Sequence, residues 1–143
     1  MTQTKRTPCV GICSTTYGDL VCRGCKRFAH EIVQWNGYQP SQQQQIWARL
    51  QNLRDEVVAQ TLSVFEQACY DKQVQAPHLQ KLSTLEQRYE LVRHLAITST
   101  PLPAAGLQTS TGTEDALVAL QEIDSEIYRR SIAHYERNYK LPV

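Results

Sequence analysis

The sequence lacks any long uninterrupted run of apolar residues. Its first residues, MTQTKRTPCVGIC, carry positive charge but not the apolar segment of a secretory signal, and no later segment approaches the roughly 20 apolar residues of a membrane span. We therefore expect a cytoplasmic protein with no membrane partner. The composition of a disordered protein is absent too, because 41% of the residues are hydrophobic and only 20% are charged.

The sequence also contains little that indicates an enzyme. The acidic residues Glu122, Asp124 and Glu126 fall within one predicted helix, where a solvated surface explains them better than an acid–base pair does. Three histidines stand alone in the sequence, without other candidate residues beside them: His78, His94 and His134. We therefore expect a protein that is not an enzyme.

Four of the five cysteines fall in two close pairs near the N-terminus. The pairs are Cys9-Val-Gly-Ile-Cys13 and Cys22-Arg-Gly-Cys25, with eight residues between them. In a reducing compartment such pairs are metal ligands or redox groups more often than disulfides. A redox pair at Cys22 and Cys25 would need the strand–helix setting of thioredoxin-like proteins, which the sequence does not indicate. We therefore predict one four-thiolate metal site formed by Cys9, Cys13, Cys22 and Cys25.

Residues 7–25 show neither helical nor strand periodicity, so a bound metal is expected to organise them. Fixing some twenty loop residues costs about 1 to 2 kcal/mol each, which is comparable to or larger than the roughly 10 to 16 kcal/mol from a structural zinc. Each cysteine pair contains a glycine, Gly11 or Gly24, that can adopt positive φ and point backbone amides at the sulfurs. Removing the metal should therefore unfold this segment.

Charge is distributed unevenly along the chain. Residues 1–54 contain seven basic and two acidic residues, a net charge of +5, whereas the remainder contains eight basic and twelve acidic residues, a net charge of −4. The basic half favours an anionic partner such as nucleic acid. Four thiolates around a divalent ion carry a net charge of about −2, however, so the nearby cations can instead balance the site itself.

Apolar spacing predicts a mainly α-helical fold. Phe28, Ile32 and Trp35 indicate a short helix that stops at Asn36-Gly37. Longer helices are predicted from residue 41 to about 72, from 83 to about 96, and from 111 to about 139. Each of the three begins with a capping-box pair: Ser41 with Gln44, Ser83 with Glu86, and Thr111 with Glu114.

The expected organisation is a small four-cysteine metal-binding module at residues 1–54 and a helical extension at residues 55–143. The extension contains about three longer helices, counting the one that begins within the module, and these could pack as a bundle. Residues 98–112, with two prolines and two glycines, are expected to form a flexible linker.

Other candidate residues have structural interpretations. Cys69 lies on an apolar helical stripe and is expected to act as a small hydrophobe, and His30 is expected to lie outside the ligand set. Aromatic residues next to lysine and arginine would suit nucleic acid, but packing explains them better: Trp35, Tyr38 and Trp47. Three tyrosines at helical spacing are typical of a core or an interface: Tyr128, Tyr135 and Tyr139.

The segment from Pro8 to about Leu53 resembles a small bacterial family known as domain of unknown function 1289. The resemblance is carried by PC-x-G-x-C, by C-x-G-C-x-R, by Glu31-Ile32 followed by Trp35, and by the helix with Ile46 and Leu50. Members of that family are described as predicted iron–sulfur proteins, so the resemblance implies that the four cysteines are cofactor ligands. Zinc suits four thiolates as well as an iron–sulfur cluster does, and the spacing leaves both open.

Three functions are therefore open at the level of sequence. The first is a non-enzymatic metal-binding module that presents a surface to a protein partner. The second is an iron–sulfur protein that transfers electrons, carries a cluster or senses redox conditions. The third is a zinc module that contacts nucleic acid through its basic half.

Overall fold

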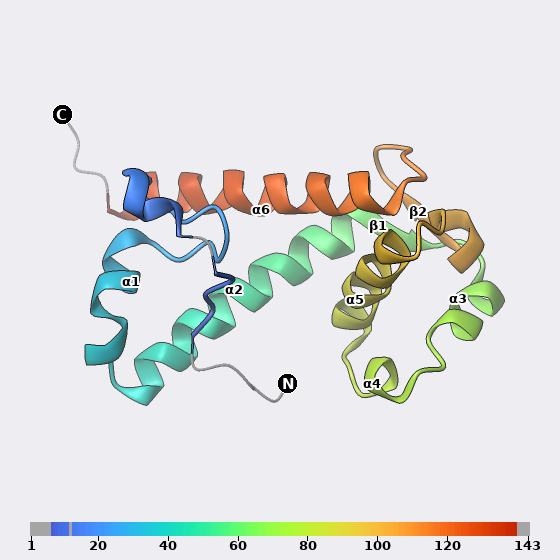
Figure 1. Cartoon of the computed structure of the whole chain (residues 1–143), viewed down its shortest axis with the longest axis horizontal. Coiled ribbons are helices and arrows are strands. Elements are labelled where there is room, and N and C mark those ends of the chain that lie inside the picture. Colours follow the sequence, from blue (N-terminus) through green and yellow to red (C-terminus); the bar gives the residue numbers. More distant parts are fainter. Residues whose placement is uncertain (1–6, 12, 140–143) are drawn as a thin grey trace. The chain divides into compact units, whose positions relative to one another are not determined.

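The structure is a computed structural model that describes residues 7–11 and 13–139. Its described elements are mainly α-helical, as predicted (Figure 1). In chain order they are η1 (Ser14–Tyr17), α1 (Ala29–Gln34), η2 (Trp35–Gly37), α2 (Pro40–Thr61), β1 (Leu62–Val64), α3 (Gln67–Gln73), α4 (Pro77–Gln80), α5 (Thr84–Ile97), η3 (Leu102–Ala105), β2 (Leu107–Thr109) and α6 (Ala116–Asn138). None of the helices in these described ranges is both long enough and apolar enough to cross a membrane.

The chain divides into two compact units. The middle unit is Arg54–Ser125, and the cysteine unit combines the described residues of 7–53 with residues 126–139. The sequence places a boundary at nearly the same point, after residue 54, but it assigns the C-terminal residues to the extension. In the structure the second half of α6 returns to the N-terminal segment and joins the cysteine unit.

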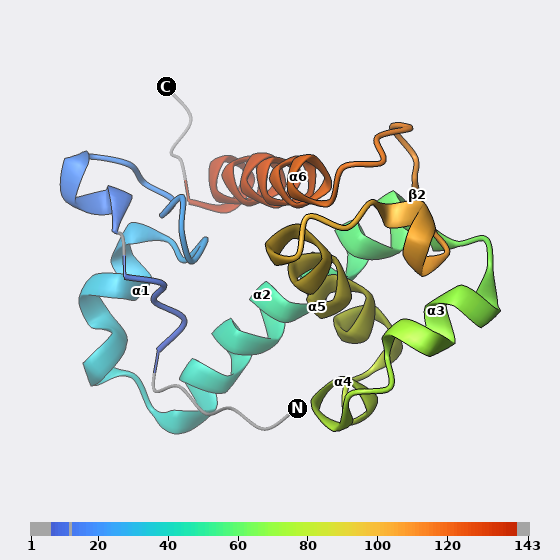
Figure 2. The same ribbon diagram turned by 45° about the vertical axis from the view of Figure 1, so that its right-hand side comes forward.

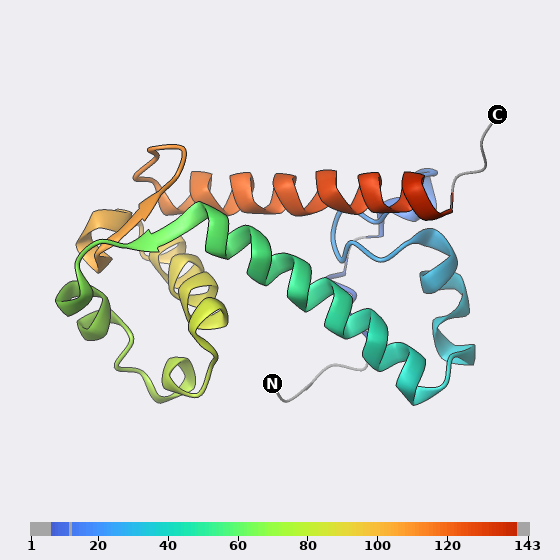
Figure 3. The ribbon, with the colours of Figure 1, turned by 180° about the vertical axis from the view of Figure 1, so that it is seen from behind.

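The predicted helix from residue 41 to about 72 is not continuous, because residues 62–66 interrupt it and residues 67–72 belong to a separate helix, α3. Helix α2 ends at Thr61, and β1 follows directly from it (Figure 3). Leu62 pairs with Thr109 and Val64 pairs with Leu107 in a two-stranded antiparallel sheet. The apolar spacing of this segment fits a helix equally well, so only the distant partner strand decides the outcome.

That partner strand lies inside the expected linker. Residues 98–112 contain η3 and β2, and Figure 2 shows β2 next to η3, within the middle unit. The turn between η3 and β2 is closed by Gly106, whose carbonyl oxygen accepts hydrogen bonds from the amides of Phe65 at 2.8 Å and Glu66 at 3.3 Å. These two bonds attach the segment to the corner between β1 and α3.

Only one of the three predicted capping pairs starts its helix. Ser83 accepts a hydrogen bond from the Glu86 amide at 3.5 Å, and α5 begins at Thr84. Helix α2 already begins at Pro40, so Ser41 lies inside it. For α6 the cap is Asp115, whose carboxylate accepts a bond from the Val118 amide at 3.1 Å.

Each unit has its own buried apolar side chains. In the middle unit they come from α2, α5, η3, α6 and the sheet, and they include Val57, Val58, Leu62, Leu91, Val92, Leu95, Leu102, Leu107 and Ile123. In the cysteine unit they include Val21, Cys22, Cys25, Phe28, Trp35, Ile46 and Ile127. Two of the predicted metal ligands therefore belong to the core of the cysteine unit.

Candidate metal centre

Cys22 and Cys25 lie at the tip of a short antiparallel hairpin. Val21 and Phe28 form a β-bridge at its base, and the Cys22 amide donates to the Arg27 carbonyl at 2.9 Å. The Lys26 amide in turn donates to the Cys22 carbonyl at 2.9 Å. We call residues 21–28 the cysteine hairpin. Its backbone hydrogen bonds hold the two thiols close together.

The tight turn is made by Lys26, which adopts a φ of 66° in the left-handed region that glycine usually occupies. The Lys26 side chain is buried, and its ammonium donates hydrogen bonds to the carbonyl oxygens of Arg23 and Gly24. Gly24 supports the turn through that carbonyl and through its amide, which is directed at the Cys22 sulfur. The Lys26 ammonium therefore stabilises the turn that connects Cys22 to Cys25.

The hydrogen bonds around Cys22 favour the deprotonated form of its side chain. Burial raises its pKa, but hydrogen bonds from the backbone of Cys25, Ser14 and Gly24 and from the Cys25 thiol outweigh burial and lower the pKa to about 7. Sulfur that accepts several amide hydrogen bonds is better stabilised as a thiolate than as a thiol. The backbone of the hairpin is thus arranged to favour the form of cysteine that binds metals.

Cys25 is held by a buried cation. Its pKa is raised by burial, and Arg27 opposes that rise through hydrogen bonds and charge. The Arg27 Nε donates to the Cys25 Sγ at 3.3 Å, while the guanidinium lies 5.0 Å from the centre of the Trp35 ring. Arg27 is only 4% exposed. A guanidinium stays charged at any ordinary pH, so its burial favours a negative charge on the sulfur.

Cys9 and Cys13 lie in the loop that precedes the hairpin. Gly11 has a φ of 95°, and its amide donates to the Cys9 Sγ at 3.3 Å. The Cys13 Sγ shares a hydrogen bond of 2.7 Å with the Thr15 hydroxyl. Residue 12, between the two cysteines, is outside the described residues. The sulfur of Cys9 thus accepts a hydrogen bond from a backbone amide, as the sulfur of Cys22 does, but in a more exposed position.

The structure brings two of the four predicted ligands together. Cys22 and Cys25 are joined by a thiol hydrogen bond, whereas within residues 7–11 and 13–139 no three cysteine, histidine, aspartate or glutamate side chains are gathered as metal ligands would be. The donor set nevertheless fits a soft metal, because four sulfurs lie on adjacent loops and each takes part in a hydrogen bond. The four-ligand site itself stays a prediction.

Other cations of this region are used inside the cysteine unit. Arg49 makes two hydrogen bonds to the Glu31 carboxylate, at 2.6 and 2.7 Å, and its guanidinium lies 4.3 Å from the centre of the Phe28 ring. Glu31 is buried and also accepts from the Phe28 amide at 2.9 Å. Arg49 thus joins α2 to the end of the hairpin.

His134 is a neighbour of the hairpin that no motif in the sequence connects with this region. The structure places its ring 5.5 Å from the Phe28 ring and nearly parallel to it, with an interplanar angle of 12°. Tyr135 and Tyr139 also contact Phe28, and His30 lies 4.9 Å from Tyr139. In the sequence, only the helical spacing of the tyrosines indicates that this part of the chain packs against another surface. That spacing does not identify the hairpin as the surface.

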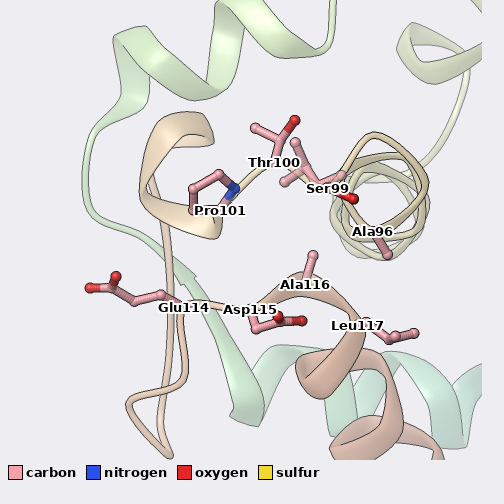
Figure 4. A pocket seen from close by; sticks show the side chains of 9 residues that line it. Ala96, Ser99, Thr100, Pro101, Glu114, Asp115, Ala116 and Leu117 are labelled. Carbon is pink, nitrogen blue, oxygen red and sulfur yellow. The ribbon is translucent and has the colours of Figure 1, made fainter.

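The middle unit contains a separate pocket of about 360 Å³ between the end of α5 and the start of α6. Figure 4 shows Asp115, Ala116 and Leu117 on one side of it and Ala96, Ser99, Thr100 and Pro101 on the other. Asp115 caps α6, and the Glu114 side chain extends away from the pocket. The lining contains no cysteine, histidine or basic residue, and its two acidic residues, Glu114 and Asp115, do not belong to any group of three potential metal ligands among the described residues.

The hairpin and the loop before it define a cysteine-rich module in which each of the four sulfurs takes part in a hydrogen bond and Cys22 and Cys25 are bonded to each other. Comparison with known families matches residues 7–54, about a third of the chain, to a family described as "Protein of unknown function (DUF1289)". This match confirms the resemblance predicted for that segment. No curated protein and no solved structure matches the chain.

Proposed function

We propose that residues 7–54 form a metal-binding module whose ligands are Cys9, Cys13, Cys22 and Cys25. The observation that carries this proposal is the buried Arg27 guanidinium, which donates to the Cys25 sulfur. A buried cation without an anionic partner is strongly destabilising, and a thiolate is the anion that this position offers. Metal binding keeps cysteine deprotonated at neutral pH.

Charge balance supports the same assignment. Four thiolates around a divalent ion carry about two negative charges, and the same net charge is common for clusters held by four cysteines. Two buried cations, Lys26 and Arg27, lie within the hairpin that carries Cys22 and Cys25. Because Lys26 and Arg27 are buried, they would offset the negative charge of the metal site in a region that solvent does not reach. A zinc ion would supply folding free energy, and an iron–sulfur cluster would supply one-electron chemistry.

We further propose that the module serves a protein partner in the cytoplasm and is not an enzyme. The loop that carries the cysteines exposes three large apolar side chains, Val10, Tyr17 and Leu20, of which Tyr17 is 88% exposed. Exposed apolar side chains next to a fixed loop favour protein recognition. Nucleic acid is less well supported, because Lys26, Arg27 and Arg49 are engaged internally.

An iron–sulfur redox or cluster-carrier function is the second candidate. Burial of Cys22 and Cys25 together with hydrogen bonds to their sulfurs favours it, since both features tune a cluster's reduction potential. The same features suit zinc. Zinc and an iron–sulfur cluster must therefore be distinguished by measuring the bound metal and sulfide.

The test is metal and sulfide analysis with an absorbance spectrum after anaerobic purification of the full chain. We expect one metal centre per chain, which is lost in Cys22→Ser and retained in the matched control Cys69→Ser. A colourless protein with one zinc supports the interaction module, and a brown protein with inorganic sulfide supports the redox candidate. Folded protein without metal, together with a Cys22→Ser variant of unchanged stability, would contradict the proposal.

A further inference from the structure

The second half of α6 presents one face to the cysteine hairpin. Tyr128, Tyr135 and Tyr139 recur at intervals of seven and four residues, which places them on a single side of a helix. Figure 1 shows this red end of α6 next to the blue N-terminal segment, within the same cysteine unit. Tyr139 directly follows Asn138, the last residue of α6, and its amide donates to the Tyr135 carbonyl at 2.8 Å, so we count it with the helix and call these three residues the tyrosine face of α6. It lies outside the family-matched residues 7–54.

The tyrosine face makes its first contact between the two hairpin cysteines. The Arg23 guanidinium, between Cys22 and Cys25 in sequence, lies 5.0 Å from the centre of the Tyr128 ring. Arg23 is also fixed through its backbone, because its amide donates to the Ser14 hydroxyl at 2.8 Å. Tyr128 thus packs on the tip of the hairpin, where the two thiols lie.

The second contact is at the base of the hairpin. Phe28 is 1% exposed, and the guanidinium of Arg49 stacks on it from α2. From α6, His134 stacks on the Phe28 ring, while the rings of Tyr135 and Tyr139 meet it edge-on at 5.4 and 5.2 Å. Aromatic pairs in this geometry add stability beyond the area they bury. Both ends of the hairpin are therefore held by α6.

We propose that the tyrosine face of α6 is part of the metal centre's support, so that metal binding and docking of α6 on the cysteine hairpin strengthen each other. This inference rests on the proposed function. If metal orders the hairpin, it also orders the surface on which α6 docks. By thermodynamic linkage, docking of α6 must then raise the affinity for metal by the same factor. Tyr128 and Tyr139 are positioning residues, which act through Arg23 and Phe28.

Hydrogen exchange on the full-length, unmutated chain tests the first direction. Amides of residues 126–139 are compared in the reduced protein loaded with Zn²⁺ and in the reduced protein stripped by a chelator. We expect exchange at residues 126–139 to accelerate at least about tenfold without metal, while α5, in the middle unit, serves as the internal reference and stays unchanged.

Zn²⁺ affinity, measured by competition with a chromophoric chelator, tests the reverse direction. We expect Tyr128→Ala and Tyr139→Ala each to weaken Zn²⁺ binding by about two- to tenfold, as expected for loss of a cation–π or aromatic contact. Tyr139→Phe keeps the ring and should restore the affinity. Glu136→Ala, an exposed change on the same helix, is the matched control and should leave the affinity unchanged.

The outcomes separate the two proposals. If Zn²⁺ binds through the cysteines but neither the exchange of residues 126–139 nor the affinity of the tyrosine variants changes, the coupling is refuted and the metal module stands. If the chain holds neither Zn²⁺ nor an iron–sulfur cluster, both proposals fail. Slower exchange with metal, together with weaker Zn²⁺ binding in Tyr128→Ala and recovery in Tyr139→Phe, would establish the coupling.

Discussion

Gly106 occupies a position where we expect a single methyl group to destabilise the middle unit strongly. Its φ is 70°, in the left-handed region, and a Cβ built on it would overlap the carbonyl oxygen of Glu66. The same Cβ would lie 3.0 Å from the Glu66 carbonyl carbon and 3.3 Å from the Cβ of Cys69. The obstacle is backbone, so no side-chain rotation can relieve it. The corner between β1 and α3 must move away.

The cost of Gly106→Ala follows from what that movement breaks. Alanine in a left-handed conformation costs about 1 to 2 kcal/mol. The amides of Phe65 and Glu66 both donate to the Gly106 carbonyl, and weakening each of these bonds adds about 1 kcal/mol. We therefore expect a loss of about 3 kcal/mol in the free energy of unfolding. The change leaves charge and hydrophobicity almost unaltered, so the effect reports on packing and backbone alone.

Gly112→Ala is the matched control. Gly112 also has a left-handed φ, 87°, but no atom lies within 4 Å of the place that an added methyl group would take. It should lose only the conformational term, about 1 kcal/mol. Urea unfolding followed by circular dichroism measures both variants. If the destabilisation of Gly106→Ala is within about 0.5 kcal/mol of that of Gly112→Ala, the tight approach of Gly106 to Glu66 and the reasoning built on it are refuted.

Two further predictions concern charged groups of the cysteine unit. Glu31→Gln leaves the Arg49 guanidinium without its carboxylate partner, and because Glu31 is buried while Arg49 is half-buried we expect a loss of about 2 kcal/mol, below the usual cost at fully buried pairs. Denaturation followed by fluorescence of the two tryptophans, both in this unit, measures it, and an unchanged midpoint would contradict it. Hydrogen bonds from Arg129 and Arg130 lower the pKa of Glu126 from 4.5 to about 2. Because the folded state favours the carboxylate, this stabilising contribution is complete above pH 4.5 and is lost as the pH falls toward 2. A carbon-13 titration of the Glu126 side chain with a midpoint near 4.5 would refute it.

The helical content could be predicted from sequence because it depends on local spacing. Helix α5 begins after Ser83, as the sequence predicts, since a cap and the residues that it satisfies lie within one turn. The break after Thr61 could not be predicted in the same way. Leu62 and Val64 form a strand only because Leu107 and Thr109 pair with them, and such a pairing leaves no periodic signal in either segment.

In the candidate site, too, features that depend on local spacing in the sequence could be predicted, whereas features that depend on distant residues could not. The spacing of the cysteines identified the hairpin pair, and the amide bonds to the sulfurs are local consequences of that spacing. The contact of His134 with Phe28 depends on elements far apart in sequence, so it could not be inferred from residues 7–54. The burial of Arg27 between Cys25 and Trp35 involves residues near in sequence, but a charged residue gives no periodic signal that it is buried.

Size explains why the cysteine module would need α6. A segment as short as residues 7–54 buries too little surface to form a secure core, and modules of that size usually depend on a metal, disulfides or a partner. In this chain the second half of α6 adds Ile127 to the same core, and the partly exposed tyrosine face packs against the hairpin. The metal and the helix then stabilise the same hairpin from two sides. Removing the metal would then weaken the docking of α6, and removing the α6 contacts would weaken metal binding. If the metal alone organised the hairpin, removing the metal would not change the docking of α6.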